Sequence, residues 1–167
     1  PGANRRIAVG AEPTPLGSAR FLRVEHSCGR AVKFSLVEGL PLVLVQASIH
    51  NRAGKPLHVG EIIPLVATVD LGTPLAGLRT LGYDGLLPAD QPRTRFFSLA
   101  AADPKTRGGL VCGWLSHDRA SGLVWSRGEQ DKLRVEPISQ YGRLAIPSGT
   151  TLQGEILWAI STPWESG

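Results

Sequence analysis

The feature that most constrains the fold is an alternation of apolar and polar residues with a period of two, which recurs along most of the chain. Such a period is typical of β-strands with one buried face, and no window keeps a helical period over three turns. The clearest example is the segment 152–160, for which the pattern predicts one face made of Leu152, Ile156, Trp158 and Ile160 and an opposite face with Gln153 and Glu155.

Turn residues separate the predicted strands at short intervals. Leu42–His50 alternates, Asn51–Pro56 interrupts it, and an extended β-branched run follows over Leu57–Val69, which together predict a hairpin. Leu71–Pro92 is rich in Gly and Pro and is predicted to be a long surface excursion. Further strands are predicted at Arg6–Val9, Arg20–Glu25, Ala31–Val37, Arg95–Ala100, Leu110–His117, Gly122–Ser126, Leu133–Ile138, Arg143–Ile146 and Leu152–Ile160. This spacing predicts an all-β fold, an antiparallel β-sandwich of about ten or more strands.

The length bounds the organisation of the chain. Its 167 residues suit a single β-sandwich domain over residues 1–167. With 42% hydrophobic and 19% charged residues the composition is that of a globular protein. The chain begins at Pro1, contains no Met, and stops soon after its last strong strand, so we expect it to be a piece excised from a longer multidomain protein.

Charge and cysteine content narrow the function classes. The Lys and Arg residues behind the net charge of +4 are spread along the chain, which argues against a nucleic-acid partner. The sequence contains no run of 18 apolar residues, so no membrane partner is expected. Cys28 and Cys112 are either two free buried thiols or one disulfide, and a disulfide would favour a secreted or periplasmic location over the cytoplasm. Neither cysteine belongs to a CxxC pair and the four His show no ligand spacing, so no metal or other cofactor is expected.

Four segments in the second half of the chain resemble a known family. Phe97–Thr106, Gly113–Gly122, Tyr141–Leu144 and Gly154–Trp158 follow one another in an order that is similar to the N-terminal β-sandwich domain of the alpha-galactosidase and raffinose-synthase group of glycoside hydrolases. The resemblance covers about residues 30–160. It implies an accessory domain, because the catalytic aspartates of that group lie on a separate (β/α)₈ barrel that this chain is too short to contain. We therefore expect no enzyme activity from this chain and a neighbouring catalytic domain as its partner.

The predicted turn at Asp118–Ser121 suggests a candidate carbohydrate site. If these four residues close a hairpin, Trp114 lies opposite Trp125 on the next strand, and two indoles form a flat platform. A sugar ring packs on such a surface, and neighbouring polar side chains could bind its hydroxyl groups. The candidate residues are Trp114, His117, Asp118, Arg119 and Trp125. Core packing and contact with a neighbouring domain remain alternative explanations for the two indoles.

Two function hypotheses follow. The first is a non-catalytic domain that binds an oligo- or polysaccharide, and an aromatic-lined groove with a few polar groups would favour it. The alternative is a purely structural domain that packs on a separate alpha-galactosidase-like barrel. A large exposed apolar patch near Trp158 and Trp164 would favour this alternative.

Overall fold

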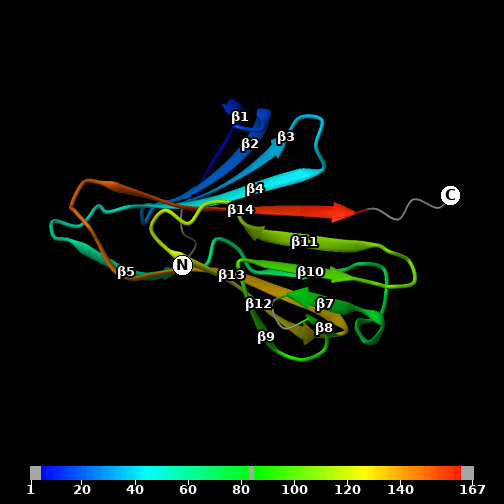
Figure 1. Ribbon diagram of the computed structural model, residues 1–167. Helices are drawn as coiled ribbons and strands as arrows, with labels where there is room; N and C mark the ends of the chain where they lie inside the picture. The colour runs from blue at the N-terminus through cyan, green and yellow to red at the C-terminus, as the bar shows by residue number, and fades with distance from the viewer. Residues whose placement is uncertain (1–4, 83–84, 163–167) are drawn as a thin grey trace.

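Two antiparallel β-sheets pack face to face in the computed structural model, which describes residues 5–82 and 85–162 (Figure 1). The large sheet has nine strands in the order β1-β2-β3-β4-β14-β11-β10-β7-β8, and the small sheet has the order β5-β13-β12-β9, with β6 also paired to β13. Within the described residues the one helical element is a short 3-10 turn, η1 (Leu75–Gly77). The predicted antiparallel β-sandwich is therefore confirmed.

The strands of the large sheet, in the order in which they lie, are β1 (Arg5–Thr14), β2 (Gly17–His26), β3 (Arg30–Val37), β4 (Leu42–His50), β14 (Thr151–Thr162), β11 (Gly109–Trp114), β10 (Ser98–Ala102), β7 (Arg79–Gly82) and β8 (Gly85–Pro88). Those of the small sheet are β5 (Leu57–Ile62), β13 (Lys132–Ile146), β12 (Ser121–Glu129), β9 (Arg93–Phe96) and β6 (Ala67–Val69).

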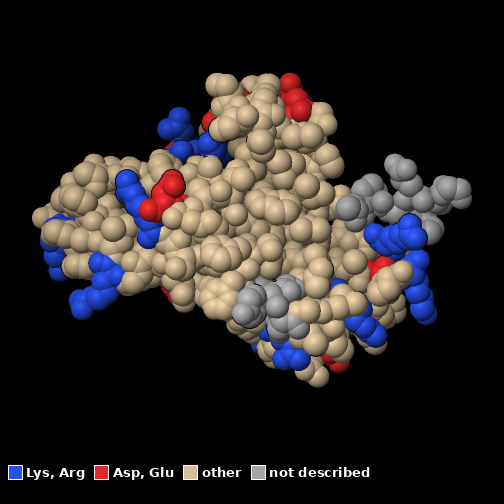
Figure 2. All heavy atoms as spheres, viewed as in Figure 1, with Lys and Arg blue, Asp and Glu red and all other residues tan. Residues whose placement is uncertain are grey.

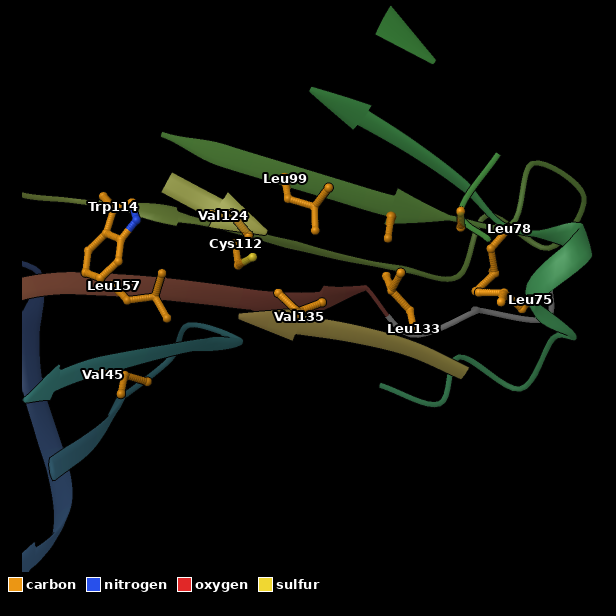
Figure 3. Packing of buried hydrophobic residues seen from close by; sticks show 12 residues of the cluster. Val45, Leu75, Leu78, Leu99, Cys112, Trp114, Val124, Leu133, Val135 and Leu157 are labelled. Carbon is orange, nitrogen blue, oxygen red and sulfur yellow. The ribbon is translucent and has the colours of Figure 1, made fainter. Parts of the chain in front are cut away.

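The main hydrophobic core fills the space between the sheets (Figure 3). Val45 and Leu157 enter it from the large sheet, and Val124 and Leu133 enter it from the small sheet. A second, separate cluster lies on the opposite face of the large sheet, which we call the outer face. It consists of Ala19, Val37, Leu42 and Leu44, with Ile156, Trp158 and Ile160 packed against them. The alternation in Leu42–His50 is thus explained, because both faces of β4 pack on apolar side chains.

Both hairpins predicted from the sequence are wrong. β4 pairs with β3 and β14 in the large sheet, while β5 pairs with β13 in the small sheet. In the same way β11 pairs with β10 and β14, whereas β12 pairs with β13 and β9. The loops after β4 and β11 carry the chain from one sheet to the other. Alternation shows which side chains are buried, but it does not show which strand lies alongside.

Three further segments differ from the sequence prediction. Leu71–Pro92, expected to be a surface excursion, contributes η1, β7 and β8, and its Leu75 and Leu78 are buried in the main core (Figure 3). The predicted strand Arg95–Ala100 is divided at Phe97, whose positive φ of 65° ends β9 and lets β10 begin in the other sheet. The two strands predicted over 133–146 are one long strand, β13, with a shift of register between Gln140 and Leu144.

The two cysteines are free, so the disulfide alternative is wrong. Cys112 lies in the core as expected, and burial raises the pKa of its thiol to about 11. Cys28, in contrast to the prediction, is exposed in the turn between β2 and β3.

Candidate functional site

A groove crosses the outer face of the large sheet. Its first part is a hollow of about 440 Å³ between the sheet and the β1–β2 turn, with apolar contributions from Leu16, Leu44, Leu115 and Ile156. At its margin Lys33 Nζ donates a hydrogen bond to Glu12 Oε1 at 2.7 Å. The two charges therefore largely neutralise each other, and this part of the groove is mainly apolar.

The second part of the groove is a polar hollow of about 270 Å³ that shares Gln46 and Ile156 with the first. Its other lining residues are Ser116, Asp118, Arg119, Thr151, Gln153, Gly154 and Glu155. We call the two hollows together the outer groove. An apolar hollow that runs into a cluster of polar groups is a common form of binding site.

A β-bulge in β14 creates the polar end of the outer groove. Gln153 lies opposite Ser48 of β4, yet Ile156 lies opposite Gln46, so β14 contains one extra residue at this point. The extra residue reverses the faces of the strand. Leu152, before the bulge, is buried with the core side chains between the sheets, whereas Ile156, after it, packs on the outer face. The prediction that these two side chains share one face is therefore wrong.

Glu155, which lies in the bulge, holds the loop that follows β11. Its carboxylate accepts hydrogen bonds from Ser116 Oγ at 2.5 Å, from the Arg119 amide at 2.9 Å and from the Asp118 amide at 3.2 Å. Its own amide donates to the buried hydroxyl of Tyr141 on β13 at 3.1 Å. Glu155 is only 5% exposed, and the loop after β11 uses its carboxylate oxygens as hydrogen-bond acceptors. Together with the contact to Tyr141, Glu155 therefore connects the large sheet, the small sheet and the loop between them.

The electrostatics of Glu155 follow from these contacts. Burial raises the pKa of its carboxyl, but the hydrogen bonds from Ser116, Arg119 and Asp118, with a smaller contribution from the charge of His117, outweigh burial, so the net pKa is below its ordinary value. Glu155 is therefore ionised at neutral pH and is a hydrogen-bond acceptor, not a proton donor. This is the chemistry of a structural clamp and differs from that of the general acid of a glycosidase, whose pKa is raised.

The two predicted platform residues do not lie side by side. Trp114 is 6% exposed in the core, where its Nε1 donates to the Leu123 carbonyl at 2.9 Å. Trp125 is on β12 in the small sheet, between Thr94 and Glu136, with the guanidinium of Arg127 5.2 Å from its ring centre. The predicted pairing failed because it assumed a hairpin between β11 and β12, which belong to different sheets.

The other three candidate residues do lie together. His117, Asp118 and Arg119 are exposed on the loop that Glu155 holds, and Asp118 and Arg119 line the polar hollow. The ring of His117 meets that of Phe97 edge to face, with centres 4.6 Å apart. Sequence reasoning missed Glu155, although a carboxylate directly after a glycine inside an apolar strand is a signal for a bulge.

The outer face carries exposed apolar side chains beside the groove and over β7 and β8. Leu115, which also lines the apolar hollow, is 52% exposed, Leu81 and Leu86 are 50% and 63% exposed, and Trp158 is half-buried. Figure 2 shows a broad surface without charged side chains over the middle of the molecule, with Lys and Arg gathered towards its margins. Trp164, the other residue named for this patch, lies outside the described residues.

In the described part of the chain, no group of three or more His, Cys, Asp or Glu side chains is arranged to hold a metal ion. The same residues include no helix with the length and apolar character to cross a membrane.

Comparison with known proteins shows a likeness of fold. No family model matches the chain, and no curated protein matches it by sequence. The alpha-galactosidase from Lactobacillus brevis superposes with a TM-score of 0.66 at 10% identity, over 96% of this chain and 26% of that one. A GH36 alpha-galactosidase from Geobacillus stearothermophilus gives a TM-score of 0.67 at 12% identity, over 95% of this chain and 27% of that one. A galactose mutarotase related enzyme from Lactobacillus acidophilus matches with a TM-score of 0.55 at 10% identity, over 96% of this chain and 72% of that one.

These likenesses confirm the resemblance stated above at the level of the fold. The chain has the fold of the N-terminal β-sandwich domain of the GH36 alpha-galactosidases and spans about a quarter of their length.

Proposed function

We propose that this chain is a non-catalytic accessory domain, related to the β-sandwich of GH36 alpha-galactosidases, that packs on a neighbouring catalytic domain through the outer face of its large sheet. The observation that carries the proposal is the exposed apolar surface of that face. Leu81, Leu86 and Leu115 are each at least half exposed there, beside the mainly apolar part of the outer groove. Apolar patches of this kind mark surfaces that another protein surface covers.

The position of the apolar part of the groove supports the same proposal. The β1–β2 turn curls over the sheet and leaves a hollow of about 440 Å³ in which an apolar loop or helix of a neighbouring domain would find Leu16, Leu44 and Ile156. At the margin of this hollow, Glu12 and Lys33 form an ion pair with each other, so neither needs an opposite charge from a partner. Because the two charges partly neutralise each other, this margin can be buried against an apolar surface of a neighbouring domain.

Side-chain footprinting tests this proposal. Hydroxyl radicals would be applied to residues 1–167 alone and to the full natural polypeptide that contains them, and oxidation would be followed by mass spectrometry. Leu81, Leu86 and Leu115 should be oxidised several-fold more slowly in the full polypeptide. Leu57 and Ile63, which are 39% and 40% exposed, serve as controls and should be oxidised equally in both. Equal oxidation of the three outer-face leucines in the two samples would contradict the proposal.

A second function, saccharide binding, is supported by the polar end of the outer groove. Asp118 and Arg119 extend their side chains from a loop whose backbone is fixed by Glu155, and they line a hollow with Gln46 and Gln153. Amide, carboxylate and guanidinium groups held in this way can bind vicinal hydroxyls, and little side-chain and loop order remains to be imposed on binding. This candidate retains Asp118 and Arg119 from the sequence prediction, with His117 beside them on the same loop but outside the lining of the hollow, and replaces the aromatic platform with a polar hollow.

Calorimetric titration with galactose, melibiose and raffinose tests the second function. A shallow polar site should bind one of them with a dissociation constant in the millimolar to micromolar range, about −4 to −8 kcal/mol. Arg119→Ala should weaken binding at least tenfold without changing the melting temperature, because its clamp contact is made by the backbone. Arg30→Ala, a change of the same charge at an exposed position on β3, is the matched control. No heat of binding with any of the three sugars would contradict this second function. An equal loss of affinity in Arg119→Ala and Arg30→Ala would also contradict it.

A further inference from the structure

The outer edge of β1 is available for pairing with another strand. β1 runs over Arg5–Thr14 at one end of the large sheet and pairs on one side with β2. Within residues 5–82 and 85–162 no strand pairs with its other side. The central part, residues 7–11, contains no charged residue and no proline. In proteins that stay monomeric, edge strands usually carry a charged residue or a proline in the middle, because a long unblocked edge is a template for pairing with another strand.

The direction of the backbone groups shows which residues of β1 face this edge. The carbonyl of Ser18 accepts a hydrogen bond from the amide of Glu38, so Ser18 directs its backbone groups towards β3. Pro13 lies opposite Ser18 and therefore faces away from β2. Because the orientation alternates along a strand, Ile7, Val9 and Ala11 also present their N–H and C=O groups to the open edge.

The side chains on the same positions are apolar and uncovered. Ile7 is 65% exposed and Val9 is 74% exposed. Val9 lies in a row with Leu22, Phe34 and Val45, which are opposite one another on β1 to β4. Val45 is buried between the two sheets, whereas the row becomes progressively exposed towards β1, since the small sheet does not extend over this part of the large sheet.

We propose that β1 pairs antiparallel with β1 of a second copy of this chain, with the two-fold axis at Val9. Val9 then lies opposite the partner's Val9, and Ile7 lies opposite the partner's Ala11. Each of these edge-facing residues exchanges N–H···O=C hydrogen bonds with the residue opposite. The two large sheets become one continuous sheet, and the exposed Ile7 and Val9 side chains pack against their counterparts.

Charge complementarity selects this register. With the axis at Val9, the exposed Arg6 lies opposite the partner's Glu12, and both side chains point to the outer face. Glu12 accepts hydrogen bonds from Lys33 and Ser35 of its own chain through Oε1, so the partner's Arg6 joins an existing ion pair as a second cation. The same contact occurs twice because of the two-fold symmetry. A shift by two residues in either direction separates Arg6 from the partner's Glu12, and a shift by one residue places edge-facing groups opposite groups already bonded to β2.

Pairing through the edge of β1 does not depend on docking through the outer face of the large sheet. Either can fail without the other, since the footprinting test reports Leu81, Leu86 and Leu115, which lie on β7, β8 and after β11, far across the sheet order from β1.

Sedimentation equilibrium over a concentration series is the first test. The chain should approach twice its monomer mass as concentration rises, and Val9→Pro should shift the half-dimer concentration upwards at least tenfold. Proline at Val9 removes an N–H that faces the open edge and leaves the β1–β2 hydrogen bonds in place, so circular dichroism should be unchanged. Val9→Lys should act in the same way, and Leu40→Lys, at a 47% exposed turn position, is the control that should dimerise normally. A monomer at concentrations up to about 1 mM, or dimers unaffected by both Val9 variants, would overturn the proposal.

Disulfide cross-linking tests the register even if a Val9 variant folds poorly. In a Cys28→Ser background, with copper-phenanthroline as oxidant, Val9→Cys should form a covalent dimer because directly opposite residues have Cα atoms about 5.5 Å apart. Ile7→Cys and Ala11→Cys should each fail to cross-link alone and should cross-link when mixed. Cross-linking of Ile7→Cys with itself, or equal cross-linking of all three variants, would exclude the two-fold axis at Val9.

Discussion

Removal of the Glu155 carboxylate is the most informative single change in this structure. Glu155→Ala leaves three donors, Ser116 Oγ and the amides of Asp118 and Arg119, without their acceptor. Hydrogen bonds to a charged group contribute about 1.5–3 kcal/mol each, but the three act on one loop and are not additive. Water entering from the adjoining polar hollow would replace part of the loss. We therefore expect a cost of about 3–4 kcal/mol, which corresponds to a fall in melting temperature of roughly 6–16 °C for a chain of this size.

The Glu155→Gln variant separates charge from shape. Gln retains one acceptor oxygen and places an NH₂ group against donors of the loop, so a cost of about 1–2 kcal/mol is expected. Urea unfolding at neutral pH measures both variants. Glu61→Gln, at an exposed position on β5, is the matched control and should change stability by less than about 0.5 kcal/mol.

The pH dependence of the same comparison gives a second readout. The folded-state pKa of Glu155 lies below its ordinary value, because hydrogen bonds outweigh burial. Its contribution to stability is therefore complete above about pH 4.3, the ordinary pKa of a glutamate, and is lost as the pH falls through the lower folded-state pKa. The difference between wild type and Glu155→Gln should shrink in this acidic range. A cost below about 1 kcal/mol for Glu155→Ala, or a difference that does not change with pH, would refute the clamp.

Three other predictions concern the core. Gly122→Ala should destabilise the chain by about 2–3 kcal/mol, because a Cβ there would overlap the Trp114 ring, whereas Gly54→Ala, which points into open space, should cost nothing measurable by urea unfolding. Trp114→Phe should cost about 1–3 kcal/mol in the same assay, since it removes buried ring surface and leaves the part-buried Leu123 carbonyl without its indole donor, and stability equal to wild type would contradict the buried position of Trp114. A thiol reagent at pH 8 should label Cys28 within minutes and Cys112 only on unfolding, because burial raises the pKa of Cys112 to about 11; two equally fast thiols would exclude the core position.

The alternation of residues predicted burial better than it predicted neighbours. In Leu42–His50 the predicted alternation is confirmed, because Val45 and Ala47 are buried between the sheets whereas Leu42 and Leu44 pack on the outer face. The next strand, β5, was predicted to form a hairpin with β4, but it lies in the small sheet. Side-chain period reports the environment of one strand, while pairing depends on contacts between segments about a hundred residues apart, such as Leu44 with Trp158.

The candidate site was predicted in part for the same reason. Asp118 and Arg119 were expected in a turn and lie on the loop after β11, because turn residues have local signals. His117 was expected to end a strand, but β11 ends at Trp114, so His117 lies on the same loop. Trp114 and Trp125 were combined through an assumed register that the change of sheet removes. The bulge at Glu155 depends on one extra residue relative to β4, and a count of that kind is available only once the partner strand is known.

Turnover of aryl glycosides by the purified chain of residues 1–167 tests the central claim, that this is an accessory domain without catalysis of its own, most directly. The account predicts no release of nitrophenol from aryl α-galactosides or other aryl glycosides above the rate in buffer, because the one deeply buried carboxylate of the outer groove, Glu155, is an ionised clamp. Turnover that disappears on changing a single carboxylate, with Glu155→Gln and Asp118→Asn as the first variants to examine, would contradict it.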